Sequence, residues 1–235
     1  MNVMVLDTET TSTNPRAGIV PEFMRVYDLG WVIVDTTNDF TEVERKNYAI
    51  MDTFCDGHLM ASAYYRSKLP WYYESMRNST LSQVPTKEAW EAFNQTCKDN
   101  EVTQVWAYNC RFDYGALNAT INAVSNGWET NWFRGVQVLD IMSAAVDIIC
   151  DKDYQLWARC HHFTTPKGNP RTTAEVVYNY VACVLHDEQE DYYDELHMAL
   201  DDARIESRIL QECFNIDPER TIEAGRKWGK RLKTN

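Results

Sequence analysis

Two acidic residues stand close together where the first apolar run ends, in the sequence Asp7-Thr-Glu9-Thr-Thr. Residues 3–6 are short and apolar, which predicts a strand buried on both faces. Side chains of a strand alternate between its faces, so Asp7 and Glu9 should point the same way, with Cα atoms roughly 6.6 Å apart. Two carboxylates that close repel each other unless a cation or a shared proton holds them. The pair predicts a hard divalent cation with oxygen ligands, Mg²⁺ or Mn²⁺. The alternative is two solvated acids in a turn.

A second set of candidate groups, His197 and the pair Asp201-Asp202, opens the last helical pattern of the chain. At about 100° per residue, the apolar positions of this pattern define a buried arc. The arc is formed by Ala199, Ala203, Ile205, Ile209, Leu210, Cys213 and Phe214. Asp202 falls inside the arc and Asp201 outside it. Burying a carboxylate without a partner is costly, so Asp202 is the functional candidate and Asp201 its solvated neighbour.

His197 precedes Asp202 by five residues, which is about 140° round an ideal helix. The two can serve one centre only if His197 lies in the loop before the helix begins, and the acidic stretch 186–195 fits such a loop. A histidine beside a bound water is a natural general base. The alternative is a structural histidine at a helix start.

The elements that must position these groups follow from hydrophobic periodicity. Besides residues 3–6, strand patterns occupy 25–34, 43–51, 102–108 and 134–139. Helical patterns occupy 59–76, 85–97, 114–124, 141–150 and 173–185. The first three strands follow one another through polar connections and predict an antiparallel meander.

A third candidate acid, Asp113, stands where the predicted strand 102–108 passes into the helix 114–124. The connecting sequence is Asn109-Cys-Arg-Phe-Asp113. In open α/β sheets, sites form at the carboxyl ends of strands. We therefore expect Asp113 to lie at the same edge of the sheet as Asp7.

Composition places few limits on function. The 235 residues suffice for one large domain, or one domain with an elaboration, and 44% hydrophobic with 25% charged residues is typical of a soluble globular protein. No apolar run approaches the ~18 residues of a membrane span, and no signal peptide is visible. Seven cysteines without a CxxC pair predict reduced thiols in a cytoplasm.

The charge pattern is mixed. A net charge of −12 argues against a nucleic-acid partner, although cations bound to an acidic site would offset part of it. Basic residues gather at 226–233 and, less densely, at 167–171. Residues 64–73 interleave aromatic and basic side chains, which could stack unpaired nucleotides or could simply belong to the core.

Three motifs in this order resemble those of the DnaQ-like 3′–5′ exonucleases of the DEDDh type, which include polymerase proofreading subunits, ribonuclease T and oligoribonuclease. The motifs are Asp7-Thr-Glu9-Thr-Thr, Asn109-Cys-Arg-Phe-Asp113, and His197 followed by Asp202. A tyrosine in place of His197 would mark the sister subtype. The resemblance covers residues 1–215 as an exonuclease domain, in which 53–100 match only coarsely as a helical elaboration. Residues 216–235 form a C-terminal basic extension.

The resemblance implies a ribonuclease H-like α/β fold, a mixed sheet with an antiparallel meander plus parallel strands, flanked by helices. It implies two Mg²⁺ or Mn²⁺ ions, held by Asp7, Glu9, Asp113 and Asp202. The metal pair would clamp a scissile phosphodiester while His197, as general base, takes the proton of the attacking water. The expected reaction releases nucleoside 5′-monophosphates from the 3′ end of single-stranded DNA. Further contacts to the terminal nucleotide are expected from Thr8, Thr10 and Asn109.

Two departures from the family pattern border this site. Ser12 replaces a common glycine, and Tyr27-Asp28-Leu29-Gly30 stands where many relatives have an acidic-Ile-Gly sequence led by glutamate. The substrate choice therefore stays open, with a 3′–5′ exoribonuclease using the same site as the first alternative. The second is a catalytically silent module that binds nucleic acid or a polymerase. A polymerase or repair protein is a candidate partner, and the tail 226–235 could grip substrate or dock such a partner.

Overall fold

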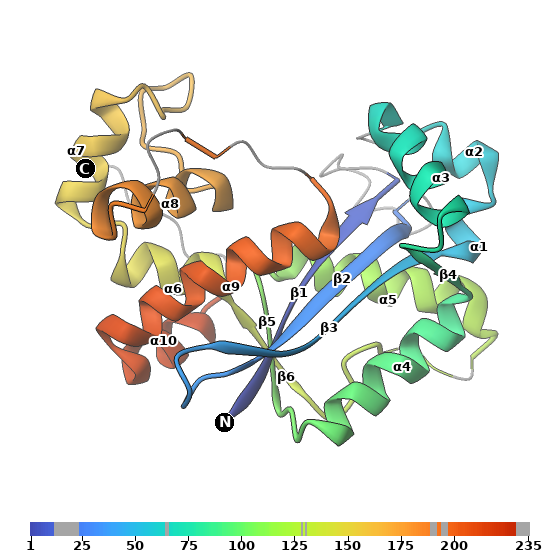
Figure 1. The fold of residues 1–235 in the computed structure, drawn as a ribbon. Helices are drawn as coiled ribbons and strands as arrows, with labels where there is room; N and C mark the ends of the chain where they lie inside the picture. The colour runs from blue at the N-terminus through green and yellow to red at the C-terminus, as the bar shows by residue number, and fades with distance from the viewer. Residues whose placement is uncertain are drawn as a thin grey trace.

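A six-stranded mixed sheet forms the centre of the molecule, which is known here from a computed structural model (Figure 1). The structure describes residues 1–11, 24–63, 66–127, 129, 131–188, 192–193 and 197–228. The strands are β1 (Asn2–Thr10), β2 (Val26–Asp35), β3 (Thr41–Ile50), β4 (Ser82–Val84), β5 (Gln104–Ala107) and β6 (Gln137–Asp140). They lie in the order β4-β3-β2-β1-β5-β6.

The pairing of the strands combines a meander with parallel neighbours. β1 pairs antiparallel with β2, and β2 antiparallel with β3, as the sequence predicted. β5 runs parallel to β1, and β6 parallel to β5. The carboxyl ends of β1, β5 and β6 therefore meet at one edge of the sheet.

Helices cover both faces of the sheet. They are α1 (Met51–Phe54), α2 (Gly57–Met60), η3 (Arg66–Lys68), α3 (Leu69–Arg77), α4 (Thr86–Asp99), α5 (Arg111–Ser125), α6 (Ile141–Ile148), α7 (Lys152–Cys160), α8 (Ala174–Tyr180), η4 (Val181–Leu185), α9 (Ala199–Ile216) and α10 (Pro218–Gly225). In Figure 1, α9 crosses the sheet beside β1 and β2, and α4 and α5 lie on the other side.

The alternation of β1 decides which face receives the acids. Val3 and Val5 belong to the core cluster that includes residues of α6, α8 and α9. Met4 and Leu6 belong to the opposite cluster, with residues of α4 and α5. Because strand residues alternate, Asp7 and Glu9 continue the row of Val3 and Val5 toward α9.

The region predicted as one helix over 59–76 is broken, so that prediction is wrong. α2 ends at Met60 and α3 begins at Leu69. Pro70 lies in the first turn of α3, where its missing amide hydrogen costs nothing, whereas inside a longer helix it would break a hydrogen bond. The segment between the predicted helical patterns 59–76 and 85–97 contains the short strand β4, parallel to β3. The predicted aromatic surface 64–73 includes residues 64–65, which lie outside the described part.

Part of the predicted C-terminal extension is packed against the body. α10 contacts α6 and α9, and a Cβ atom added to Gly225 would lie 2.5 Å from the Trp106 ring. The Trp228 indole Nε1 donates to the Val138 carbonyl at 3.2 Å. Residues 229–235, which carry the rest of the basic tail, lie outside the described part.

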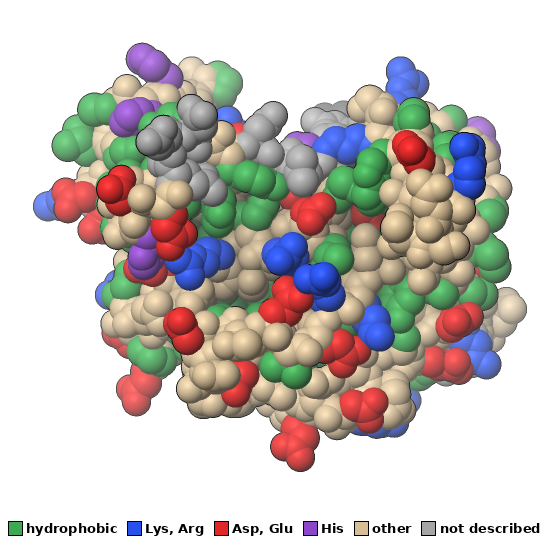
Figure 2. Space-filling model, in the orientation of Figure 1, with side chains coloured by type: hydrophobic (Ala, Val, Ile, Leu, Met, Phe, Trp, Pro, Cys, Tyr) green, Lys and Arg blue, Asp and Glu red, His purple; other side chains and the backbone are tan. Residues whose placement is uncertain are grey.

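The surface drawn in Figure 2 intersperses acidic and basic side chains. Several acidic and basic side chains of the protein are paired, among them Arg204 with Glu42 at 3.4 Å and Arg208 with Glu188. The described residues of the face in Figure 2 therefore form no broad surface that carries only basic side chains. Among the helices in the described part of the chain, none combines the length and apolar character needed to cross a bilayer.

Candidate functional site

The first two acids lie within β1 itself. The strand continues to Thr10, so both acids are strand residues rather than part of a following turn. In the antiparallel register with β2, Asp7 pairs with Gly30 and Glu9 with Asp28. Glu9 is buried and Asp7 is partly exposed. The sheet thus presents both carboxyl groups at the carboxyl end of its central strand.

The third acid and the histidine come from the start of α9. The helix begins at Ala199, which places His197 in the preceding loop, where the sequence analysis required it. His197 has a positive φ of 53°, which turns the chain immediately before the helix. Asp202 is buried at 4% exposure and Asp201 is only partly buried, as the apolar arc of the helix predicted.

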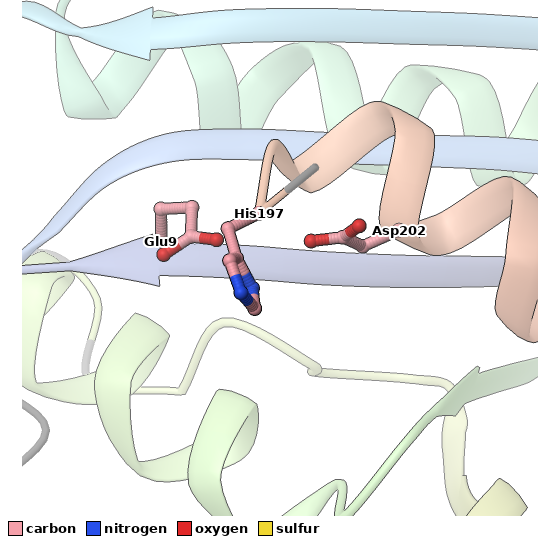
Figure 3. Close-up of side chains that lie close together, drawn as sticks. All are labelled: Glu9, His197 and Asp202. Atoms are coloured by element: carbon pink, nitrogen blue, oxygen red, sulfur yellow. The ribbon is translucent and has the colours of Figure 1, made fainter. Parts of the chain in front are cut away.

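Glu9, His197 and Asp202 converge on one space (Figure 3). The carboxylates of Glu9 and Asp202 point toward each other, with His197 between them. One ligand atom from each residue lies within 4.8 Å of the other two. Among the described residues, Asp7 and Asp113 do not belong to a group whose ligand atoms all lie within this distance. This arrangement brings residues from opposite ends of the chain to the edge of β1.

Gly30 explains why α9 can approach the sheet so closely. A Cβ atom added to Gly30 would lie 2.2 Å from the Leu200 backbone nitrogen and 2.4 Å from the Ala199 carbonyl carbon. Any side chain at this position would collide with backbone, which cannot move aside without displacing the helix. Gly30 therefore determines how closely α9, and with it Asp202, approaches the sheet.

Two hydrogen bonds fix Asp113 at the same edge, one to its own carboxylate and one to the turn that precedes α5. α5 begins at Arg111, earlier than predicted, so Asp113 lies in its first turn. The Thr8 hydroxyl donates to Asp113 Oδ1 at 2.8 Å. The turn before α5 is fixed by Asp140, at the end of β6, whose Oδ1 accepts from the Cys110 amide at 3.0 Å.

Burial, together with repulsion between neighbouring carboxylates, disfavours the ionised acids of the site. Burial raises the pKa of Asp7 well above its usual value, and the charges of Glu206, Asp113, Asp202 and Glu9 raise it further. Burial also raises the pKa of Asp113 to about 7, although the Thr8 hydrogen bond works in the opposite direction. Both carboxyl groups are therefore harder to ionise than free acids, Asp113 because it is buried and Asp7 because it is buried beside four other acids.

Glu206 is a site residue that the sequence analysis missed. Its side chain is 3% exposed, and its Oε2 accepts from the Tyr108 amide at 3.2 Å, at the end of β5. Among the neighbouring charges, that of Glu206 raises the pKa of Asp7 the most. A signal existed, because Glu206 follows Asp202 by four residues and so lies on the same face of α9.

The three residues expected to contact a terminal nucleotide lie in different surroundings. Thr8 is buried and its hydroxyl is bonded to Asp113. Thr10 is also buried, whereas Asn109 is exposed after β5 with a positive φ of 60°. Asn109 is thus the side chain of the three that solvent can reach.

The donor set matches a hard divalent cation. Carboxylate oxygens from Glu9 and Asp202, with Asp7 and Asp113 close enough to repel electrostatically, are the ligand type that Mg²⁺ and Mn²⁺ prefer. A cation placed among them would turn mutual repulsion into attraction. The geometry therefore provides a candidate metal centre with a histidine at its edge.

Comparisons with known proteins place the fold. No protein-family model and no curated protein matches the sequence. The solved nuclease domain of 3'hExo, a DEDDh family member bound to rAMP, is similar with a TM-score of 0.58 at 9% identity, over 99% of this chain and 96% of that domain. Exonuclease X in complex with 5′ overhanging duplex DNA gives a TM-score of 0.48 at 12% identity, over 95% and 99%. The predicted fold class is confirmed: this chain has a ribonuclease H-like α/β fold, a mixed sheet flanked by helices.

Proposed function

We propose that this chain is a metal-dependent 3′–5′ exonuclease that hydrolyses the terminal phosphodiester bond of single-stranded DNA and releases nucleoside 5′-monophosphates. The observation that carries the proposal is the convergence of Glu9, His197 and Asp202 within 4.8 Å at the end of β1. The same edge holds Asp7 and Asp113, so all five residues of the motifs gather in a fold shared with a nuclease domain.

Asp7, Glu9, Asp113 and Asp202 are the residues that would hold two Mg²⁺ or Mn²⁺ ions. Bound there, the ions would neutralise charge on the phosphodiester and favour the attacking hydroxide. The chain itself supplies orientation. Thr8 fixes the Asp113 carboxylate through its hydrogen bond, and Gly30 allows α9 to pack closely against β2.

His197 is the proposed general base, which takes a proton from the attacking water at an imidazole nitrogen. Its ring lies between the carboxylates of Glu9 and Asp202, whose negative charge favours the imidazolium form that results. Displacement at phosphorus requires positioning and charge neutralisation more than covalent chemistry, which suits a centre built from carboxylates and one histidine.

Contacts to the terminal nucleotide are proposed for Asn109, Thr8 and Thr10. Asn109 offers an exposed amide in the turn that leads into α5, the helix that carries Asp113. Because the Thr8 hydroxyl already binds Asp113, Thr8 would contribute through its backbone. The net charge of −12 makes long-range attraction of DNA weak, so the metal ions themselves would supply much of the local positive charge.

The second candidate is the same hydrolysis on RNA. The 3'hExo nuclease domain is described as bound to rAMP, a ribonucleotide, and it shares the fold of this chain. Matched DNA and RNA oligonucleotides of one sequence separate the two substrates directly. Faster release of mononucleotides from RNA would show that the protein is an exoribonuclease.

The test uses single-stranded oligonucleotides labelled at the 3′ or the 5′ end, incubated with Mg²⁺, Mn²⁺ or EDTA. We expect metal-dependent release of the 3′ label as a mononucleotide. The 5′-labelled strand should become shorter one nucleotide at a time. Asp7→Ala should abolish the release, and His197→Ala should reduce it to a slow residual rate. Absence of cleavage with either nucleic acid under every metal would instead favour a silent module that binds nucleic acid or a polymerase.

A further inference from the structure

Asp28 is a buried acid outside the predicted motifs. It lies in β2 opposite Glu9 and is fully buried. Its Oδ2 accepts two hydrogen bonds, from the Tyr72 hydroxyl at 2.7 Å and from the Ala199 amide at 3.1 Å. These donors come from α3 and from the first residue of α9, so one oxygen atom joins three elements.

The residue that precedes α9, Met198, does not cap the helix with its side chain. The first amides of a helix have no partner within the helix, and an acceptor near them is stabilising. Asp28 provides this acceptor from across the sheet, and its negative charge also suits the positive end of the helix dipole. The cap therefore comes from tertiary structure.

The capped amide stands two residues after His197. Between them lies Met198, which is buried, and His197 itself turns the chain with a positive φ. On the other side, Gly30 admits the Ala199 and Leu200 backbone against β2. A constraint on the Ala199 amide is therefore a constraint on the orientation of His197.

Tyr72 fixes Asp28 in turn. Its ring is fully buried, 5.6 Å from the Tyr27 ring and 5.9 Å from the Phe54 ring between centroids. Packing on two aromatic neighbours leaves the ring in place when only the hydroxyl is removed. The hydrogen bond to Asp28 can thus be deleted without opening a large cavity.

We infer that Asp28 and Tyr72 are positioning residues that orient His197 through the first amide of α9. The inference rests on the proposed function, in which His197 is the general base. The inference gives α3, within the coarsely matching region 53–100, an indirect part in catalysis. Tyr72 of this helix donates a hydrogen bond to Asp28, and Asp28 in turn fixes the Ala199 amide that follows His197. The pair touches neither substrate nor the reacting atoms.

The first test measures orientation and does not require activity. The imidazole carbon-bound proton signal of His197 is assigned by NMR through its loss in His197→Ala. Tyr72→Phe and Asp28→Asn should move or broaden this signal. Tyr73→Phe, the same atomic change at an exposed neighbour in α3, should leave it in place. An unchanged His197 signal in both Tyr72→Phe and Asp28→Asn would overturn the inference.

The second test separates positioning from general stability. In wild type, we expect Tyr72→Phe to lower kcat by about ten-fold or more, since small misplacements of catalytic groups are costly, and to leave KM within about two-fold. In a His197→Ala background, the same change should cost nothing further, because the group it orients is gone. A full additional loss in that background would overturn the inference. An inactive wild type would overturn the proposed function, while the NMR result would still decide the positioning.

Discussion

The ionised carboxyl group of Asp7 is unfavourable in the metal-free protein because it is buried and four other acids lie near it. Burial and the charges of Glu206, Asp113, Asp202 and Glu9 all raise its pKa. A fold that gathers so many carboxylates sacrifices stability at this point, a trade-off common at functional sites. The arrangement becomes favourable when cations enter it.

Glu206→Gln tests this account at one residue. The amide keeps the shape of the side chain and can still accept from the Tyr108 amide, but it removes the charge that raises the Asp7 pKa most among its neighbours. We expect the metal-free protein to gain roughly 2–4 °C in Tm. Mn²⁺ affinity, measured by calorimetry, should fall by roughly five-fold.

The matched control is Glu219→Gln, which removes an equal charge from an exposed position in α10. It should change neither Tm nor Mn²⁺ affinity. A Glu206→Gln protein that is less stable without metal, or that binds Mn²⁺ as tightly as wild type, would contradict repulsion as the main role of this charge.

At the scale of elements, the approach of α9 to β2 determines the site. Gly30→Ala would force a Cβ atom to 2.2 Å from backbone, so the start of α9 must shift. We expect Tm to fall by roughly 5 °C, as overpacking commonly costs 1–3 kcal/mol. Nuclease activity should fall by about 100-fold, because His197 and Asp202 move with the helix.

Gly57→Ala is the control for this substitution. Apart from its chain neighbours and the backbone of its own helix, no described heavy atom lies within 4 Å of a Cβ built at Gly57, and this residue begins α2. Its Tm should stay the same or rise slightly, because alanine is the better helix former. Equal Tm and activity for the two variants would show that the Gly30 contact does not place α9.

Elements were predictable where a repeating pattern exists. The alternation of β1 correctly placed Asp7 and Glu9 on one face, and the apolar arc of α9 separated Asp202 from Asp201. β4 is three residues long and pairs through its backbone, so its side chains give little pattern. α10 was missed although its signal was present: the Asp217 side chain caps the Arg220 amide, directly before Pro218.

At the scale of the whole molecule, contacts between distant segments could not be predicted from one sequence. The hydrogen bond between Asp28 and the Ala199 amide joins residues 171 positions apart, and neither residue type predicts the contact. The proximity of Asp113 to Asp7 followed from the rule that sites form at the carboxyl ends of strands. The same rule applies to Asp140, whose role in fixing the Cys110 amide became visible only in the structure.

The stability of the whole metal-free protein should fall as the pH rises from 5 toward 8. Burial raises the pKa of Asp113 to about 7 and that of Asp28 to about 6, and it raises that of Asp7 as well. In the unfolded chain these groups titrate near pH 4. Between those values the folded protein binds protons that the unfolded chain has released. This proton binding stabilises the folded state at low pH, and the stabilisation is lost as the pH rises past the folded pKa values.

Thermal unfolding in EDTA across this range should show Tm falling by roughly 3 °C or more. Added Mg²⁺ should reduce or reverse the fall, because the ion binds the ionised carboxylates of the folded state. A Tm in EDTA that stays level or rises between pH 5 and pH 8 would contradict the placement of these acids.

The measurement that tests the central claim most directly compares two adjacent acids of α9. Asp202→Asn removes a buried carboxylate that faces Glu9 and His197, and Asp201→Asn removes its partly exposed neighbour. Release of mononucleotide from a 3′-labelled single strand with Mn²⁺ should fall by about 1,000-fold in Asp202→Asn, the scale of losing several kcal/mol of charge stabilisation. It should stay within about two-fold in Asp201→Asn. Equal losses in the two variants, or an active Asp202→Asn protein, would show that the convergent centre is not where the reaction takes place.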